Sequence, residues 1–298
     1  MPPYIDPSFE LVIDIALRQK ESDIARCVRE THEHLLAAAM AETSADALAA
    51  GVYRLRYYLA EGGCLHQWLA ILNRAVNRTV TPLAAIQREV SLGWLLFLND
   101  QPESAAFCFD TAEHLIVAES PSADRANGWP PVFQAELDLS IGRFFLSAQQ
   151  NPGVGDVLDA LDYWQHNSRL FPPDMEKRLV LALASLKSAR GMIPDSHANA
   201  YDAYYYFLAR GLNAEAGLAA FYLARCYAYN DDRDPLFTPS PEEAERWLRV
   251  AAWHWFTIRL PLGLRLLAPF AGSIAQEMPT LRVSPFKRIV TPSLYTLN

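Results

Sequence analysis

Cysteine is scarce in this sequence, and its few thiols lie far apart. The four cysteines (Cys27, Cys64, Cys108 and Cys226) form no CxxC pair, and each lies within an apolar helical pattern. A disulfide framework or a zinc finger needs cysteines at close, regular spacing. We therefore expect buried free thiols.

Long apolar runs and secretion signals are also missing. The first ten residues, MPPYIDPSFE, contain neither a basic region nor an apolar run of signal-peptide length. The most apolar stretch, residues 250–271, is interrupted by a histidine, two arginines and two prolines. These interruptions disfavour a membrane-spanning helix. The sequence thus predicts a cytoplasmic protein without a transmembrane segment.

Residue patterns for metal, cofactor and catalytic sites are lacking as well. His32 and His34 point to different helix faces, and Cys64 and His66 flank a turn without a second pair of ligands. The acidic loop around Asp231 has neither the central glycine nor the closing glutamate of a calcium loop. No nucleophile elbow, phosphate-binding glycine loop or dinucleotide fingerprint occurs. We expect no metal, no cofactor and no enzymatic activity.

Positive charge is in short supply over most of the chain. The net charge is −8, which disfavours nucleic acid as a partner. Residues 246–298 nevertheless contain seven cations and one anion, a net +6, which leaves −14 for residues 1–245. We expect this basic segment to make peripheral contact with an acidic surface, either of a protein or of lipid headgroups. The alternative is that Arg246 and Arg249 pair with carboxylates of the preceding helical turn.

What the sequence does contain is helical periodicity. Apolar residues recur at three- and four-residue steps, which is the spacing of one helix face. The clearest case is residues 213–255, where two such patterns flank a loop rich in proline and aspartate. Ser240 and Pro241, followed by two glutamates, then form a typical helix start. Ser44 is expected to begin another helix in the same way. Residues 213–255 therefore predict a pair of packed helices.

Residues 82–119 predict another helix pair, with a pattern of small and aromatic residues. Leu92-Gly93 is followed by Ala105, then by Phe109 and Ala112, and Ile141-Gly142 repeats the first part of this pattern. We expect Gly93 and Ala105 to face each other, because small residues allow two helices to approach closely. Phe109 is expected to fill the space next to the following pair.

These patterns resemble a known superfamily of helical repeats. Residues 92–112 are similar to a tetratricopeptide repeat. Residues 177–255 resemble the Sel-like branch of the same superfamily through Ala214, Leu223-Ala224, Tyr227, Ala244 and Trp247. The resemblance implies an all-α protein, a right-handed αα-hairpin solenoid with a short helical C-terminal cap. It implies N-terminal capping helices at residues 1–43, helix-pair repeats at 44–255, and a C-terminal cap or tail at 256–298.

The resemblance also implies a concave face, lined by the first helix of each pair. On the Leu92-Gly93 repeat the family pattern selects Gln87, Val90, Trp94 and Phe97. On the Ile141-Gly142 repeat it selects Glu136, Leu139 and Arg143, and on the Leu223-Ala224 repeat it selects Leu218, Phe221 and Arg225. We expect Trp94 to anchor the partner, because an aromatic residue in a concave site often contributes roughly 2 kcal/mol or more to binding.

Two aromatic clusters each have two interpretations. The four consecutive rings at 204–207 cannot all face one core from a helix, so they either contact both neighbouring repeats or form a ligand surface. Trp253 and Trp255, on either side of His254, either dock a partner or a membrane interface, or pack beneath the C-terminal cap. We include both tryptophans among the candidate contact residues.

The expected function follows from the implied architecture, since no catalytic constellation is present. We expect a non-catalytic scaffold, adaptor or chaperone of a bacterial cytoplasmic assembly or secretion pathway, which binds a protein or peptide partner in the concave groove. One alternative is an immunity-type protein that binds a toxin domain and blocks it. Another is an enzyme of uncharacterised activity.

Overall fold

The protein is helical throughout the part that the computed structural model describes, which is residues 24–75, 78–79, 81–119, 131–150, 153–228 and 238–270. These residues form twelve α-helices and three short 3-10 helices, and they contain no β-strand. The prediction of an all-α fold is therefore confirmed. Residues 1–23 of the predicted N-terminal cap and residues 271–298 of the predicted C-terminal tail lie outside the described residues.

The helices follow one another in this order along the chain. The α-helices are α2 (Ile24–Ala41), α3 (Ala45–Leu55), α4 (Leu65–Ala75), α5 (Pro82–Leu98), α6 (Pro102–Glu119), α7 (Pro131–Gln149), α8 (Val154–Asn167), α9 (Pro173–Ala189), α10 (Ile193–Ala209), α11 (Asn213–Ala228), α12 (Pro241–Ile258) and α13 (Pro261–Leu267). The 3-10 helices are η2 (Leu59–Gly62), η5 (Ser168–Leu170) and η6 (Ala268–Phe270).

Local sequence signals explain where several helices begin. Ser44, Thr81 and Ser240 occupy N-cap positions, and each hydroxyl oxygen accepts a hydrogen bond from the backbone N–H three residues later, at 3.2, 3.4 and 3.3 Å. Such a bond satisfies one of the N–H groups that the first helical turn leaves unpaired. The predicted helix starts at Ser44 and Ser240 are thus confirmed.

Four tight turns share one backbone conformation. Asp100, Gly191, Gly211 and Arg259 each have a positive φ, between 53° and 75°. In every case the next N–H bonds to the carbonyl five residues before it, at 2.9–3.0 Å. This pattern is the Schellman ending of a helix, which reverses the chain within a few residues. It makes α5 and α6, α9 and α10, and α10 and α11 into helix hairpins.

Phe109 of α6 packs against both α5 and α7. Its ring is fully buried, and a Cβ atom built at Gly93 of α5 or at Gly142 of α7 would lie 2.4 Å from it. Only glycine leaves room for the ring at that distance. The expectation that Phe109 fills the space towards the next pair is confirmed. The three atoms nearest to a Cβ at Gly93 belong to Phe109, and the expected facing of Gly93 and Ala105 stays a prediction.

Trp255 of α12 plays the same part in the C-terminal helices. Its ring is fully buried between Gly217 of α11 and Gly263 of α13, where added Cβ atoms would both lie 2.2 Å away. The indole Nε1–H donates to the carbonyl oxygen of Ala214 at 3.2 Å. Trp255 therefore packs beneath the C-terminal helix, which is one of the two interpretations that its sequence position left open.

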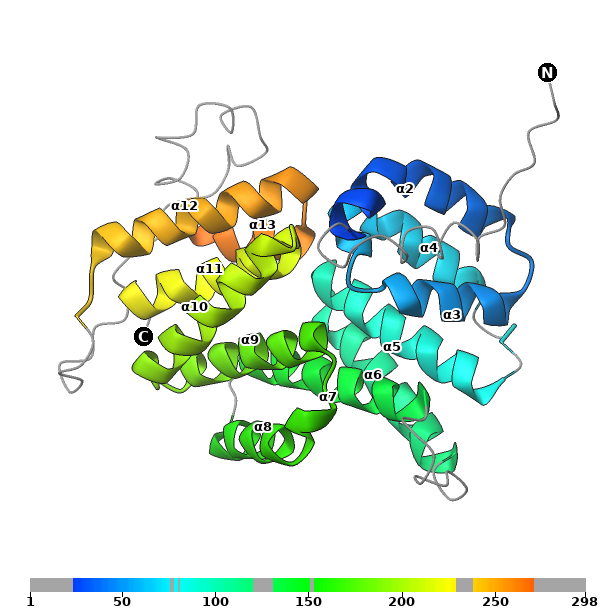
Figure 1. Cartoon of the computed structure of the whole chain (residues 1–298), viewed down its shortest axis with the longest axis horizontal. Coiled ribbons are helices and arrows are strands. Elements are labelled where there is room, and N and C mark those ends of the chain that lie inside the picture. Colours follow the sequence, from blue (N-terminus) through cyan, green and yellow to red (C-terminus); the bar gives the residue numbers. More distant parts are fainter. Residues whose placement is uncertain are drawn as a thin grey trace.

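The N-terminal and C-terminal groups of helices contact each other. In Figure 1, α2–α6 form one side of the molecule and α9–α13 form the other, with α7 between them. η2 touches both α11 and α12, and α13 touches α5. In a strictly linear solenoid each repeat contacts only its sequence neighbours, so these long-range contacts are an addition to that pattern.

The helices differ in how completely their neighbours cover them. α5 packs against α3, α4, α6 and α7, and α11 packs against α9, α10 and α12. The helices that contact α10 extensively are α9 and α11. One face of α10 is therefore left towards solvent, and aromatic residues lie on that face.

Candidate functional site

The helical periodicity of α10 divides its aromatic residues between core and solvent. Tyr204 and Phe207 are buried, with 8% and 0% of their surface exposed, whereas Tyr205 is 48% exposed. Tyr206 is half-buried, and its hydroxyl donates to Oδ1 of Asp174 at 2.7 Å. In the aromatic run at 204–207, Tyr204 and Phe207 thus pack in the core, and Tyr205 lies on the outer surface.

Three rings at four-residue steps make up the outer face of α10. His197 stacks on Tyr201 with ring centres 6.0 Å apart, and Tyr201 lies 4.7 Å from Tyr205. The Tyr201 hydroxyl donates to the Tyr205 hydroxyl at 3.2 Å. Side chains four residues apart lie one above the other on a helix. We call this row, His197, Tyr201 and Tyr205, the aromatic ladder.

An open groove runs along the aromatic ladder. It has a volume of about 680 Å³, and Ala198, Asp202 and Tyr206 complete its lining. Rings supply most of this lining, while Asp202 adds a carboxylate. Tyr201 and Tyr205 are both nearly half exposed. Exposed tyrosine side chains of this kind are enriched at protein contact sites.

The row of rings continues from α10 to α12. The Tyr204 ring lies 5.0 Å from Trp247 and 6.0 Å from His254, and His254 lies 4.8 Å from the ring of Trp253. Trp253 is 55% exposed. This predicted contact residue therefore stands at the end of a chain of touching rings that begins at Tyr205.

The charges around the groove are mostly negative or paired. α10 contains two carboxylates, Asp195 and Asp202, and neither lysine nor arginine. Lys177 of α9 pairs with Oδ2 of Asp202 at 2.8 Å. The hydrogen bond to Tyr205 raises the pKa of Tyr201, and burial lowers the pKa of His197. The aromatic ladder is therefore uncharged at neutral pH.

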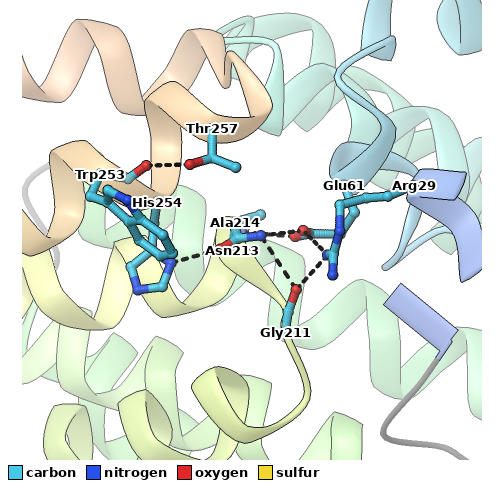
Figure 2. A network of polar contacts seen from close by, with 8 residues as sticks. All are labelled: Arg29, Glu61, Gly211, Asn213, Ala214, Trp253, His254 and Thr257. Atoms are coloured by element: carbon cyan, nitrogen blue, oxygen red, sulfur yellow. Dashed lines mark hydrogen bonds and ion pairs between the residues drawn. The ribbon is translucent and has the colours of Figure 1, made fainter. Parts of the chain in front are cut away.

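A buried polar network joins α12 to the N-terminal helices (Figure 2). Nδ1 of His254 donates to Oδ1 of Asn213 at 2.8 Å, and Nδ2 of Asn213 donates to Oε2 of Glu61 at 2.8 Å. Glu61 also accepts from Nη1 of Arg29 at 3.0 Å and from the backbone N–H of Ala214 at 3.1 Å. We call Arg29, Glu61, Asn213 and His254 the closing junction, because they connect α2 and η2 to α11 and α12.

Two members of the closing junction have strongly shifted pKa values. Burial, reinforced by the nearby Glu215, raises the pKa of Glu61 to about 7, against the opposing effect of its hydrogen bonds and Arg29. Burial lowers the pKa of His254 to about 4. Since the Oδ1 atom of Asn213 only accepts, the neutral His254 carries its proton on Nδ1. At neutral pH the junction therefore contains an uncharged histidine and a carboxyl group close to its titration midpoint.

A second buried polar cluster joins α3, α7, α9 and α11. The guanidinium of Arg178 lies 3.5 Å from the centre of the Tyr57 ring, and that of Arg56 lies 4.1 Å from the same ring. Arg56 pairs with Asp138, and Arg178 pairs with Glu215. Each guanidinium is thus matched by a carboxylate, and the contacts of the cluster hold these helices together.

The predicted groove-lining residues on α5 lie in the core. Val90, Trp94 and Phe97 are 0%, 5% and 2% exposed. The Trp94 ring packs edge-on against Tyr57 and Phe145, with centres 5.7 and 5.8 Å apart. The expectation that Trp94 anchors a partner is therefore wrong, because helices cover α5 on several sides and leave it no free face.

Of the predicted contact residues on α11 and α12, two are buried and one is exposed. Phe221 is 6% exposed and Trp255 is 0% exposed, and their rings pack on each other at 5.9 Å. These two assignments as contact residues are also wrong, whereas the exposed Trp253 stays a candidate. Leu139 and Leu218, which the same pattern selected, are buried at 4% and 2% exposure.

The polar members of the predicted groove keep partial access to solvent. Gln87, Glu136, Arg143 and Arg225 are all half-buried. Arg143 of α7 pairs with Asp110 at 2.7 Å and with Glu113 at 2.6 Å, both on α6. The visible role of Arg143 is therefore to hold α6 against α7.

Of the aromatic ladder, Tyr205 lies in the run at 204–207 for which a ligand surface is one interpretation, whereas His197 and Tyr201 are not among the predicted contact residues. The sequence contains a signal for it, since His197, Tyr201 and Tyr205 recur at four-residue steps on a helix without lysine or arginine. A helix whose aromatic face is buried can show the same spacing. An exposed aromatic face can be told from a buried one only when the helices packed around it are known.

The basic C-terminal segment is described only in part. Arg246 pairs with Glu243 at 3.3 Å, and Arg249 pairs with Glu245 at 4.0 Å. These pairs agree with the alternative in which the two arginines neutralise carboxylates of their own helix. Arg265 pairs with Asp100. Arg282, Lys287 and Arg288 lie outside the described residues. A second, electrostatic surface at this end of the chain stays a prediction.

Three other expectations concern thiols, metals and membranes. All four cysteines are free, and three are buried, while Cys64 is half-buried. No group of three or more histidine, cysteine, aspartate or glutamate side chains suited to a metal ion lies within the described residues. None of the helices in the described part of the chain combines the length and the apolar character needed to cross a membrane.

Comparison with known proteins does not assign this site. No protein-family model matches the sequence, and neither a curated protein nor a solved structure matches it. The resemblance to tetratricopeptide and Sel-like repeats is therefore carried by the quoted residues alone, and the function has to be argued from the geometry of the aromatic ladder.

Proposed function

We propose that this chain is a non-catalytic protein-binding adaptor whose contact surface is the aromatic ladder of α10, extended by Trp253. One observation carries the proposal: Tyr201 and Tyr205 stand side by side, nearly half exposed, over an open groove of about 680 Å³. Aromatic side chains are enriched at protein contact surfaces because they bury a large area while few torsion angles become fixed.

The ladder is built on a rigid element, which supports a binding role. Tyr204 and Phe207 anchor α10 in the core, and the hydroxyl of Tyr206 is held by Asp174. Tight Schellman turns connect α10 to α9 and α11. A surface that is already ordered loses little conformational entropy when a partner binds.

As part of the proposal we keep the architecture and setting that the sequence resemblance implies. These are a right-handed solenoid of tetratricopeptide/Sel-like helix pairs and a role in a bacterial cytoplasmic assembly or secretion pathway. The successive helix hairpins with one shared turn geometry support this reading. The proposed contact surface is different, since it lies on the outer face of α10 and not on the buried residues of α5.

A pull-down from native cells tests this function. The bait is the wild-type chain or a double variant with Tyr201→Ser and Tyr205→Ser, and circular dichroism verifies that each bait is folded. Phe107→Ser is the matched control, because Phe107 is an exposed aromatic residue on α6, 72% accessible and on another helix. We expect one partner to be recovered with the wild type and with the control variant, and to be lost with the double variant.

Equal recovery of the partner by all three baits would contradict the proposal. The nature of the partner then separates the adaptor from the neutralising alternative. An adaptor continues to bind a short proteolytic segment of its partner, whereas an immunity-type protein needs the folded toxin domain and blocks its activity.

A further inference from the structure

We propose that the aromatic ladder accepts an arginine side chain of the partner, with its guanidinium over the Tyr205 ring and paired with the carboxylate of Asp202. This inference rests on the proposed function, and it specifies the chemistry of the segment that the groove binds. Four observations support it: the charge around the groove, the free oxygen of Asp202, the exposed ring of Tyr205, and the way other rings of this protein already bind guanidinium groups.

The charge around the groove favours a cationic ligand. α10 carries two carboxylates and no cation. Lys177, Arg210 and Arg246, the cations whose contacts reach this face, are each paired with a carboxylate, at 2.8, 3.4 and 3.3 Å. A partner that brings positive charge to this surface is therefore attracted, and an acidic one is repelled.

Asp202 retains an oxygen that can receive a hydrogen bond. Its Oδ2 contacts Nζ of Lys177, and none of the described residues donates to its Oδ1. The Asp202 side chain is 54% exposed, whereas that of Lys177 is 21% exposed. The carboxylate is thus open on the groove side, three residues from Tyr205 and on the same helical face.

The rings of this protein repeatedly bind cations over their faces. Within the groove, the guanidinium of Arg210 lies 4.7 Å from the centre of the Tyr206 ring, and Nζ of Lys177 lies 5.9 Å from it. In the core, Arg178 lies over Tyr57 at 3.5 Å. Among the described residues, no cation lies over the ring of Tyr201 or Tyr205. His197 and Tyr205 contact the Tyr201 ring on either side, whereas Tyr205, at the end of the row and 48% exposed, can receive a side chain from outside.

Arginine fits this arrangement better than lysine. A guanidinium is planar and weakly hydrated, so it can stack on a tyrosine ring while its N–H groups reach a carboxylate at the ring edge. An ammonium group is compact and strongly hydrated, and it loses more hydration energy on an apolar ring. The groove should therefore distinguish arginine from lysine as well as from neutral side chains.

Three labelled peptides test the inference with the full chain. All are Gly-Ser nonamers, and they carry three arginines, three lysines or three citrullines; citrulline has nearly the shape of arginine without its charge. The protein contains 3-fluorotyrosine, and Tyr→Phe variants assign the fluorine signals of Tyr201 and Tyr205. We expect the arginine peptide to shift both signals and to bind about tenfold more tightly than the citrulline peptide, with the lysine peptide between them.

Variants of two exposed carboxylates give the matched control. Asp202→Asn should reduce the affinity for the arginine peptide to about that of the citrulline peptide, whereas Asp159→Asn, on the exposed face of α8, should leave it unchanged. Arginine and citrulline peptides that bind equally, or that both fail to bind, overturn the inference. Anionic vesicles that perturb Tyr201 and Tyr205 without any preference for arginine overturn it in favour of a membrane surface.

These failures are distinguishable from failure of the proposed function. If the double variant at Tyr201 and Tyr205 loses the cellular partner while the arginine preference is absent, the adaptor function stands and only the arginine inference is withdrawn. If the double variant retains the partner, the ladder is not the contact surface, whatever the peptides show.

Discussion

Replacing Glu61 by glutamine should change how the free energy of unfolding depends on pH. Glu61 is 3% exposed and receives hydrogen bonds from Arg29, Asn213 and the N–H of Ala214 in the closing junction. A glutamine side chain is similar in shape and does not titrate, but it has one accepting oxygen where Glu61 has two. It can therefore accept either from Arg29 and Asn213 or from the N–H of Ala214. The loss of the other bonds lowers the free energy of unfolding by an amount that does not change with pH. Arg29 keeps its bond to the carbonyl of Gly211 at 2.9 Å in such a variant.

The direction and size of the effect follow from the pKa of Glu61. Folding raises this pKa from 4.5 to about 7, so between these values the folded protein binds more protons than the unfolded chain. The contribution of Glu61 to stability is therefore present at low pH and is lost as the pH rises through 7. The difference corresponds to about 3 kcal/mol. Relative to the wild type, E61Q should gain up to about 3 kcal/mol between pH 4.5 and pH 7.5.

His254 gives the opposite slope and serves as the internal control. Folding lowers its pKa from 6.5 to about 4, so the unfolded chain binds more protons between these values. The free energy of unfolding therefore falls as the pH drops from 6.5 to 4. A glutamine at position 254 can still donate to Asn213 without titrating. Relative to the wild type, H254Q should gain stability as the pH is lowered, whereas E61Q should gain it as the pH is raised.

Urea denaturation at several values between pH 4 and pH 8, followed by tryptophan fluorescence, measures these differences directly. The wild type has both groups, and between pH 4.5 and 6.5 their contributions oppose each other. Differences from the wild type that stay constant with pH in both variants would refute the account of the closing junction. Slopes of the same sign in E61Q and H254Q would contradict it as well.

The remaining predictions concern the glycine contacts and one turn. Gly93→Ala and Gly142→Ala each place a Cβ within 2.4 Å of the Phe109 ring, so each should lower the free energy of unfolding by about 1–3 kcal/mol in urea denaturation. Gly155→Ala, whose Cβ meets nothing within 4 Å, should leave it unchanged or slightly higher, and equal losses at all three positions would count against the packing argument. Arg259→Gly relieves a left-handed residue with φ 53° and should raise stability by about 0.5–1 kcal/mol; a lower melting temperature would contradict the assigned turn.

Features that depend on a few neighbouring residues could be predicted from the sequence. The helix starts at Ser44 and Ser240 follow from side-chain oxygens placed just before a helical pattern. The position of Phe109 between two helix pairs followed from the small residues that surround it in the pattern. These interactions are local, or they repeat a known packing motif, so spacing alone carries the information.

Features that depend on which helices meet could not be predicted in this way. Trp94 and Tyr205 are both aromatic residues on amphipathic or apolar helices, yet the first is 5% and the second 48% exposed. The difference comes from the neighbours of α5 and α10, which are set by the whole chain. The apolar residues on all sides of α5 are a signal of complete burial, and this signal argued against Trp94 as a surface anchor.

The closing junction shows the same limit more strongly. Asn213 and Glu61 are 152 positions apart in the sequence, and nothing in the spacing of either residue indicates the other. Glu61 lies in a short turn, where a glutamate is ordinarily solvated. Only the contact of η2 with α11 and α12 explains why this carboxyl group is buried and why its pKa is raised.

Site-specific crosslinking in native cells shows directly whether α10 carries the contact surface. A photoreactive phenylalanine derivative is placed at position 205 in the aromatic ladder and, in a separate strain, at position 107 on α6, where the side chain is even more exposed. We predict one discrete crosslinked protein from position 205 and none of that product from position 107. No crosslink from position 205, or the same product from both positions, would contradict a contact surface on α10.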